Sequence, residues 1–288
     1  MEEVRIQRAV SADGTKIAGR VIGQGPPLVL VHGGIGDGEF AWTELLPHLT
    51  DRFTCYLPST RGRGLSGDHP DHSLLRLQED IDAFVESIGE PVCMMGWSGG
   101  GPLVLGTAER TESATAVAAW EAGGSPEILG PEGQADLGRL AAALEQVGMA
   151  AAERRLVDAV RAFLIGICND EEIAALGGTD FHERWSGGVP ELLVFVQQLM
   201  AAEGPGPDAP EALAQITVPV LLLTGEETLL AAAFGDATRH IAAHVAEAQV
   251  REVPGVGHFA PVVAPKRVAA ELISFFASAW QDLASRPA

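Results

Sequence analysis

The sequence predicts an α/β fold, in which a mainly parallel, twisted sheet carries helices on both faces and an inserted helical segment. Short apolar segments alternate along the chain with segments whose apolar residues recur at helical spacing. This alternation favours parallel strands that are connected by helices. It stops between about residues 123 and 210, where Ala, Leu and Glu dominate at helical periodicity, and we interpret this interruption as a helical insertion.

Eight segments have the composition of strands. Residues 4–10 and 16–22 are expected to pair as a hairpin, because the Asp13-Gly14 dipeptide between them is a strong turn signal. The other six are apolar runs typical of buried strands, at 28–31, 53–57, 92–95, 116–120, 220–224 and 248–253. Apolar residues at helical spacing predict helices over 74–88, 102–110 and 268–280.

The same pattern predicts the domain organisation. A first core segment (1–122) is followed by the helical insertion (123–210), which closes with a Gly- and Pro-rich loop over 203–210, and by a second core segment (211–288). Ligands of such sheets bind at the carboxyl ends of the strands. Functional residues are therefore expected in the loops that follow the strands.

Composition and charge exclude several classes of function. The chain has 288 residues, a formal net charge of −20 and a hydrophobic fraction of 47 %. The negative charge argues against a nucleic-acid partner, which requires clustered Lys and Arg, and no run of about 18 apolar residues could cross a membrane. The N-terminus lacks the segments of a secretory signal, so a cytoplasmic location is expected. Cys55, Cys93 and Cys168 lie in apolar runs and are expected to be buried thiols.

The segment Gly96-Trp97-Ser98-Gly99-Gly100 is the strongest functional signal. It reads as G-x-S-x-G, a sharp strand-to-helix turn that lifts a serine hydroxyl away from the sheet. Glycines are needed on both sides of such a turn, because a Cβ there would strike the neighbouring strand or helix. A simple glycine-rich turn is the alternative, but the position between a predicted strand and a predicted helix favours Ser98 as a nucleophile.

Two other loops carry groups that a serine nucleophile requires. The strand at 27–31 ends in His32-Gly33-Gly34, whose backbone amides can face a developing oxyanion. The last predicted strand is followed by Gly257-His258-Phe259, which places His258 where a general base is expected. With these motifs in this order, the chain resembles the α/β-hydrolase fold family from about residue 29 to the C-terminal helix.

This resemblance implies a serine hydrolase of the esterase or lactonase type. The oxyanion hole would consist of backbone N–H groups of Gly34 and Gly99, with Gly33 as a substitute for Gly34. His32 would structure its loop and take no part in proton transfer. A serine at the elbow disfavours dehalogenase and epoxide-hydrolase chemistry, because family members with those activities use an aspartate there.

The acid of the catalytic triad departs from the common pattern of the family. Many members carry an aspartate three residues after the glycine that ends the seventh strand, and Thr228 occupies that place here. The family also uses a position just after the sixth strand, where this chain has Glu121. We favour Glu121, because an unpaired carboxylate directly after a buried strand is costly. Glu226 and Glu227 remain as alternatives.

The family carries its cap as a helical insertion after the sixth strand, so the resemblance implies that residues 123–210 form a helical cap (lid) over Ser98. Aromatic side chains are expected to select the substrate there. Trp185 is the first candidate, because the surrounding Arg184, Ser186, Gly187 and Gly188 suggest an exposed turn, and Trp97 and Phe163 are further candidates. Phe181 and Phe195 are further aromatic residues of residues 123–210 that could line an apolar pocket, with packing of the cap onto the core as the alternative role for each. The histidines lack the spacing of metal ligands, so neither a metal nor another cofactor is expected.

The expected substrate is a small apolar ester or lactone. Family lactonases that open macrolactones also place a glutamate after the sixth strand, so a macrolactone is one form of this expectation. A carbon–carbon bond hydrolase, a perhydrolase and an acyltransferase use the same triad, and a ligand-binding receptor with slow turnover is an alternative of a different class. The sequence is compatible with a homodimer and does not determine the oligomeric state.

Overall fold

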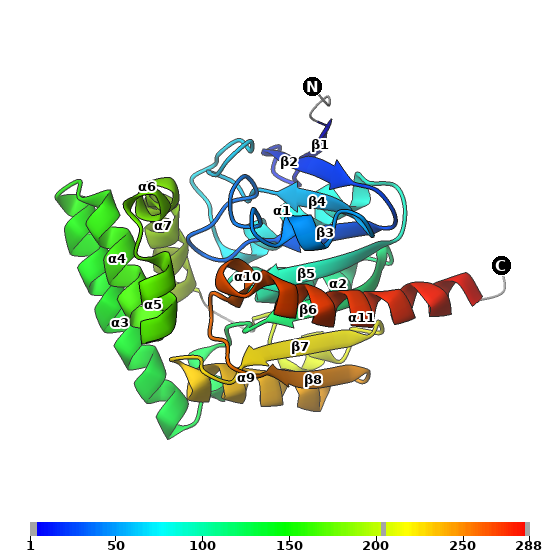
Figure 1. The fold of residues 1–288 in the computed structure, drawn as a ribbon. Helices are drawn as coiled ribbons and strands as arrows, with labels where there is room; N and C mark the ends of the chain where they lie inside the picture. Colours follow the sequence, from blue (N-terminus) through cyan, green and yellow to red (C-terminus); the bar gives the residue numbers. More distant parts are fainter. Residues whose placement is uncertain (1–4, 203–205, 286–288) are drawn as a thin grey trace.

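The computed structural model describes residues 5–202 and 206–285, so Val4 of the first predicted strand and residues 203–205 of the predicted loop lie outside the described residues. The sheet has eight strands in the order β1-β2-β4-β3-β5-β6-β7-β8 (Figure 1). The strands are β1 (Arg5–Val10), β2 (Lys16–Gly23), β3 (Pro27–Val31), β4 (Thr54–Pro58), β5 (Val92–Trp97), β6 (Ala114–Trp120), β7 (Val220–Gly225) and β8 (Ala248–Val253). Every segment predicted as a strand is a strand, with bounds that differ by at most two residues.

The sheet is mainly parallel, as the sequence predicts. Strand β2 pairs antiparallel with β1 and with β4, and all other neighbouring strands are parallel. The central strands β3 and β5 are buried along their whole length. This burial explains why they are continuous apolar runs, since both faces of a parallel sheet are covered by helices.

Helices cover both faces of the sheet. They are α1 (Leu74–Glu86), α2 (Gly100–Arg110), α9 (Ala231–His244), α10 (Ala260–Val263) and α11 (Pro265–Ser285), with a short 3-10 helix η1 (Leu46–His48). Side chains alternate across a strand, so Leu28 and Leu30 of β3 join the core beneath α11, whereas Val29 and Val31 join the core beneath α1 and α2. Figure 1 shows α11 in front of the sheet and α1, α2 and α9 behind it.

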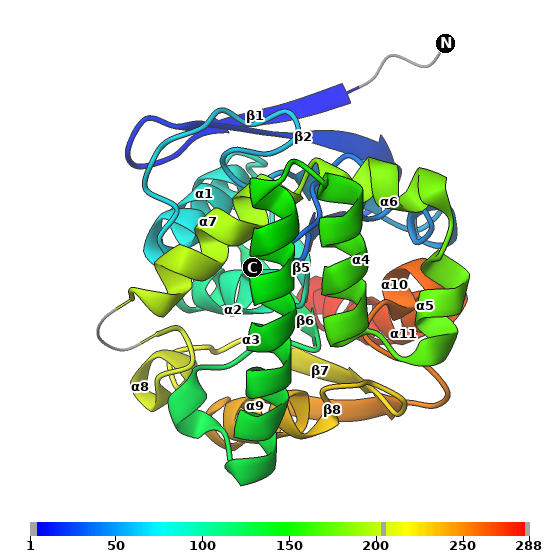
Figure 2. The same cartoon turned by 90° about the vertical axis from the view of Figure 1, so that its left-hand side faces the viewer.

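The segment between β6 and β7 is helical. It contains the 3-10 helix η2 (Pro126–Ile128) and the helices α3 (Pro131–Ala152), α4 (Leu156–Ile167), α5 (Asp170–Leu176), α6 (Thr179–Ser186), α7 (Val189–Met200) and α8 (Pro210–Leu213). No strand occurs among the described residues of this segment. We call α3 to α7 the inserted helices. They stand beyond the carboxyl ends of the strands and lie in front of the sheet when it is viewed along the strands (Figures 1 and 2).

Two aspartates join the inserted helices to the core. Asp136 of α3 accepts hydrogen bonds from the backbone N–H groups of Ala232 (2.9 Å) and Ala233 (3.1 Å) at the start of α9. Asp236 of α9 accepts one from the N–H of Gly130 (2.8 Å) at the start of α3. Each carboxylate thus satisfies free N–H donors at the N-terminus of the other helix, where negative charge is favoured.

The cysteines are free and buried, as predicted. Burial raises the pKa of Cys55 and of Cys93 to about 12, so both stay uncharged at neutral pH. Within the described part of the chain, no helix is both long and apolar enough to cross a bilayer.

Candidate active site

Ser98 lies at a strained turn between β5 and α2. Its φ of 53° is in the left-handed region, which costs a non-glycine residue about 1–3 kcal/mol. Its backbone N–H donates to the carbonyl of Trp120 (2.8 Å), and its own carbonyl accepts from Gly101 (2.8 Å). A Cβ on Gly101 would lie 2.5 Å from the Cβ of Ala122, so the turn packs directly against the residues that follow β6. The glycines therefore have the steric role that the sequence predicts.

Glu121 and His258 form a buried pair across the ends of β6, β7 and β8. His258 Nδ1 lies 2.7 Å from Glu121 Oε2, and the two side chains are 2 % and 0 % exposed. The same carboxylate accepts hydrogen bonds from the N–H of Gly225 (2.8 Å) and from the hydroxyl of Thr228 (3.0 Å). These donors replace the water that burial removes from the carboxylate. With Nδ1–H donating to Glu121, Nε2 is left as the proton acceptor of the imidazole.

The alternative acids Glu226 and Glu227 lie elsewhere. Both residues are exposed, and the Glu226 carboxylate accepts from the N–H of Gly255 (2.9 Å). Neither side chain forms a hydrogen bond to His258 in the structure, and the Thr228 hydroxyl donates to Glu121. The structure therefore brings Glu121, and neither of the two loop glutamates, into contact with His258.

Aromatic side chains fix the backbone and the ring of His258. The indole N–H groups of Trp97 (3.0 Å) and Trp120 (3.1 Å) both donate to the His258 carbonyl. The Phe234 ring of α9 lies parallel to the imidazole, with centroids 5.0 Å apart and an interplanar angle of 8°. Trp97, predicted to contact the substrate, is only 2 % exposed, and its indole holds the histidine loop. This contact joins residues 161 positions apart, so no local motif of the sequence indicates it.

The glycines proposed for the oxyanion hole meet beside Ser98. A Cβ on Gly33 would lie 3.4 Å from the Cβ of Ser98, and a Cβ on Gly99 would lie 3.4 Å from the backbone nitrogen of Gly34. Gly99 directly precedes α2, where backbone N–H groups have no partner within the helix. Gly34 and Gly99 are thus neighbours across the two loops, as a shared oxyanion site requires.

Two basic side chains structure the loop after β3. Arg63 is buried and donates to the carbonyls of Gly34 (2.7 Å) and Gly36 (2.9 Å). Burial lowers the pKa of Arg63 to about 10, which leaves it charged at neutral pH. His32 Nδ1 lies 2.9 Å from the Gly33 carbonyl, and Nε2 accepts from the Thr60 N–H (3.2 Å). Burial, assisted by Arg63, lowers the pKa of His32 to about 3, so His32 is neutral. Both ring nitrogens are engaged, which fits a structural role for His32.

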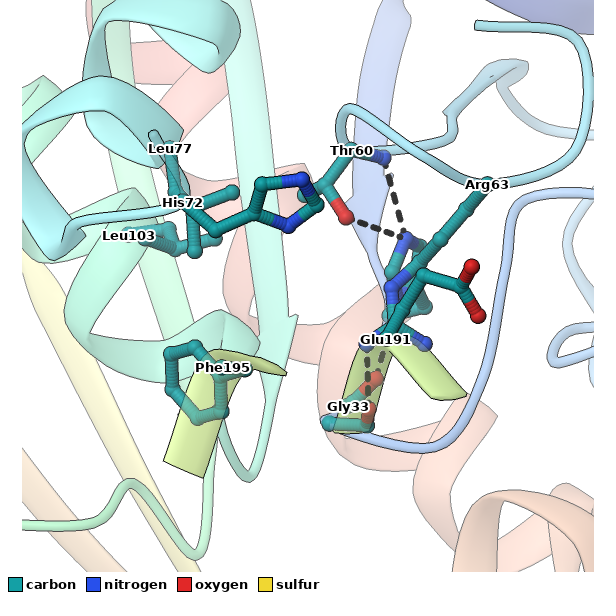
Figure 3. Close-up of a pocket in the computed structure, with 11 residues that line it drawn as sticks. Gly33, Thr60, Arg63, His72, Leu77, Leu103, Glu191 and Phe195 are labelled. Atoms are coloured by element: carbon teal, nitrogen blue, oxygen red, sulfur yellow. Dashed lines mark hydrogen bonds between the residues drawn. The ribbon is translucent and has the colours of Figure 1, made fainter. Parts of the chain in front are cut away.

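A small cavity borders the two glycine loops. Its volume is about 20 Å³, enough for about one water molecule. Figure 3 shows the imidazole of His72 and the ring of Phe195 facing it, with Glu191 and Arg63 on the opposite side. It is lined by His32, Gly33, Gly34, Thr60, Arg63, His72, Leu77, Gly99, Leu103, Glu191 and Phe195. Phe195 of α7 is the aromatic side chain of the inserted helices that reaches this cavity, and its ring lies 3.6 Å from the Cβ position of Gly99.

The expected exposed turn at Trp185 is wrong. Trp185 lies inside α6 and is 3 % exposed. Its ring stacks on Phe181 (centroids 5.1 Å apart) and packs edge-on against Phe40 (5.0 Å) and Trp97 (5.9 Å). The glycines that suggested a turn follow the helix, since Gly187 caps its C-terminus. Phe163 of α4 is likewise buried, at 7 % exposure, and does not line the cavity.

No group of three or more His, Cys, Asp or Glu side chains in the described segments could hold a metal ion. The pair His240 and His244 on α9 is bound to backbone carbonyls. His240 Nε2 lies 2.8 Å from the Asp208 carbonyl, and His244 Nδ1 lies 2.9 Å from the His240 carbonyl. These contacts give both rings a structural role in the helix and its neighbouring loop.

Comparison with known proteins finds chains of similar sequence and fold. The chain matches a family described as the alpha/beta hydrolase family over residues 28–271. A stretch of 91 residues is 37 % identical to pyrrolizixenacetamide deacetylase of Xenorhabdus hominickii, and this alignment covers 30 % of the chain and 33 % of that protein. An alpha/beta hydrolase from Sphaerobacter thermophilus is 26 % identical, with a TM-score of 0.70 over 94 % of this chain and 100 % of its own. An esterase from a Rhodococcus species is 24 % identical, with a TM-score of 0.74 over 95 % and 98 % of the two chains.

Proposed function

This chain belongs to the alpha/beta hydrolase family, and on that premise we propose that it is a serine hydrolase that cleaves a carboxylic ester or lactone through an acyl-enzyme. The observation that carries the proposal is the hydrogen bond of 2.7 Å between His258 and the buried Glu121. A buried imidazole that is held by a carboxylate and leaves Nε2 free is the arrangement of a general base. The strained serine at residue 98 supplies the nucleophile for that base.

The reaction follows from these roles. His258 Nε2 takes the proton of the Ser98 hydroxyl while Oγ attacks the acyl carbon, and the N–H groups of Gly34 and Gly99 hold the oxyanion. His258 then gives its proton to the leaving alcohol as the carbon–oxygen bond breaks. Water attacks the acyl-enzyme with His258 again as base, which releases the acid and restores Ser98. The hydroxyl of Ser98 and the imidazole of His258 do not hydrogen-bond in the structure, and catalytic hydrogen bonds of free enzymes commonly form only with substrate bound.

We propose the inserted helices as the cap that selects the substrate. Phe195 of α7 supports this proposal, because it faces the cavity beside Gly34 and Gly99. Trp185 and Phe163 belong to the buried core cluster, so they support the position of the inserted helices. Leu77 of α1 and Leu103 of α2 line the same cavity as Phe195, and these three side chains support an apolar group of the substrate at this place.

Removal of a small acyl group, such as acetyl, is a second candidate for the same triad. The cavity of about 20 Å³ beside the oxyanion glycines accommodates a group about the size of a methyl or a water molecule. The partial relative from Xenorhabdus hominickii is a deacetylase by name. Esters and amides of short acids are therefore part of the substrate panel, alongside lactones.

Turnover of a graded substrate panel tests the proposal. We expect hydrolysis of p-nitrophenyl acetate, longer p-nitrophenyl esters, a lactone or an N-acetyl arylamine, together with labelling of the protein by a fluorophosphonate. Ser98→Ala should keep the melting temperature and lose both turnover and labelling, because triad serines contribute roughly a million-fold. Residual turnover above about a hundredth of the wild-type rate would show that Ser98 is not the nucleophile.

A further inference from the structure

The peptide group that follows His258 is held from both of its polar ends. Its carbonyl oxygen accepts the indole N–H groups of Trp97 and Trp120. Its nitrogen belongs to Phe259, and that N–H donates to Oε1 of Glu172 at 2.6 Å. Glu172 lies on α5 of the inserted helices and is 3 % exposed. A buried carboxylate outside the triad therefore fixes the backbone of the base.

Glu172 also contacts the residue on the other side of His258. A Cβ on Gly257 would lie 2.5 Å from Glu172 Oε2, so only glycine leaves room for the carboxylate here. Asn169 completes the arrangement as the N-cap of α5, because its side chain accepts from the Glu172 N–H (2.9 Å) and donates to the Glu227 carbonyl (2.8 Å). The start of α5 is thus bound to the loops after β7 and β8, which a helix cap alone does not require.

We propose that Glu172 is a positioning residue that sets the orientation and the proton affinity of His258 from the inserted helices. This inference rests on the proposed function, in which His258 is the base. When Glu172 is ionised, its negative charge favours the imidazolium that forms during the reaction. Its hydrogen bond to Phe259 fixes the backbone that carries the imidazole, and a small misplacement of such a group is costly in rate.

The charges around His258 support this role. Glu121 approaches from the end of β6 and Glu172 from α5, whereas Phe234 of α9 and the two indoles are uncharged. Burial raises the pKa of Glu172, and the attraction of a protonated His258 and the N–H of Phe259 act against this rise. Cys168 lies beside both carboxylates, and its pKa is raised by burial and by their charges, so it stays a neutral thiol. Glu121 and Glu172 are therefore the two carboxylates that are placed to stabilise a positive charge on His258 during the reaction.

The test compares Glu172→Gln with Glu171→Gln. Both variants remove one negative charge from the first turn of α5, but Glu171 is exposed and does not contact the histidine loop. Two quantities are measured: kcat on p-nitrophenyl acetate at pH 8, and the midpoint of His258 protonation from NMR of histidine-labelled protein, assigned with His258→Gln. We expect Glu172→Gln to lower kcat about ten-fold and to move the midpoint to lower pH by about half a unit. Glu171→Gln should change neither.

Each outcome decides the proposal. Equal kcat values and equal midpoints for the two variants overturn it, as does a loss of kcat in Glu172→Gln with an unchanged midpoint. If Glu172→Gln does not fold, Glu172→Asp replaces it, because it keeps the charge and shortens the reach to Phe259. Wild-type kcat in that variant also overturns the proposal. The NMR midpoint needs no turnover, so it still tests Glu172 if every substrate and the fluorophosphonate fail, a result that would refute only the hydrolase assignment.

Discussion

Replacing Glu121 by glutamine should reduce kcat far more than it reduces the stability of the fold. Three donors face the carboxylate in the structure: His258 Nδ1–H, the Gly225 N–H and the Thr228 hydroxyl. A glutamine keeps the size but has one acceptor oxygen and one NH₂ group, so at least one buried donor faces another donor. That conflict costs roughly 1–3 kcal/mol of unfolding free energy. Neutralising a triad acid costs about ten-thousand-fold in kcat, or about 5 kcal/mol in the barrier. The variant should therefore be folded and almost inactive.

The assay combines initial rates on a p-nitrophenyl ester with calorimetric unfolding of the same preparation. The matched control is the double change Glu226→Gln and Glu227→Gln, which removes two exposed carboxylates near the same loops. We expect the control to lose less than about ten-fold in kcat, because solvent screens exposed charges. A mild Glu121→Gln together with an inactive double variant would falsify the assignment of the acid to the end of β6.

The remaining predictions concern pH and substrate size. Burial, assisted by Arg63, lowers the pKa of His32 to about 3, so as pH falls from about 6.5 to 3 the unfolded chain takes up a proton that the folded chain does not. The stability that neutral His32 contributes is present above about pH 6.5 and lost below it. His32→Asn should therefore flatten the fall in melting temperature between pH 7 and 5, and parallel curves for the two proteins would contradict this. Phe195→Ala should raise KM for long acyl esters more than for acetate, because Phe195 borders the cavity; equal changes would place the acyl site elsewhere. Trp185→Ala should lose about 3–5 kcal/mol of stability as a buried aromatic and weaken turnover of both esters alike, and selective loss of the bulky ester would show direct contact.

The strands could be predicted from the sequence because buried strands carry their signal locally. Segments such as 28–31 and 220–224 are apolar on both faces of the sheet, and each ends near a glycine. The error at Trp185 has a physical cause. Helix α6 has only eight residues, and most of its polar side chains are exposed. Trp185 is buried by packing against Phe40 and Trp97, which are distant in the chain. Gly187 and Gly188 do form a turn, but this turn follows Trp185 and connects α6 to α7.

The residues of the candidate site also differ in whether the sequence could predict them. Ser98 and His258 stand in local motifs, so their positions follow from neighbouring residues. The sequence favours Glu121 as the acid but does not exclude Glu226 or Glu227. The reason is that Glu121 and His258 are 137 positions apart in the chain, and their contact forms beside the end of β7. Arg63 and Glu172 were missed because their partners are backbone groups of distant loops. A backbone partner leaves no residue type in the sequence that would identify it.

The hydroxyl of Thr228 donates to the carboxylate of Glu121 at 3.0 Å, so side chains from the ends of β6 and β7 meet beside the imidazole. Position 228 is therefore a second place at which a carboxylate would lie close to this site. If an aspartate replaced Thr228, it would lie next to Glu121, and two carboxylates this close would share a single proton. His258 would then keep one anionic partner, whichever of the two carboxylates held the proton.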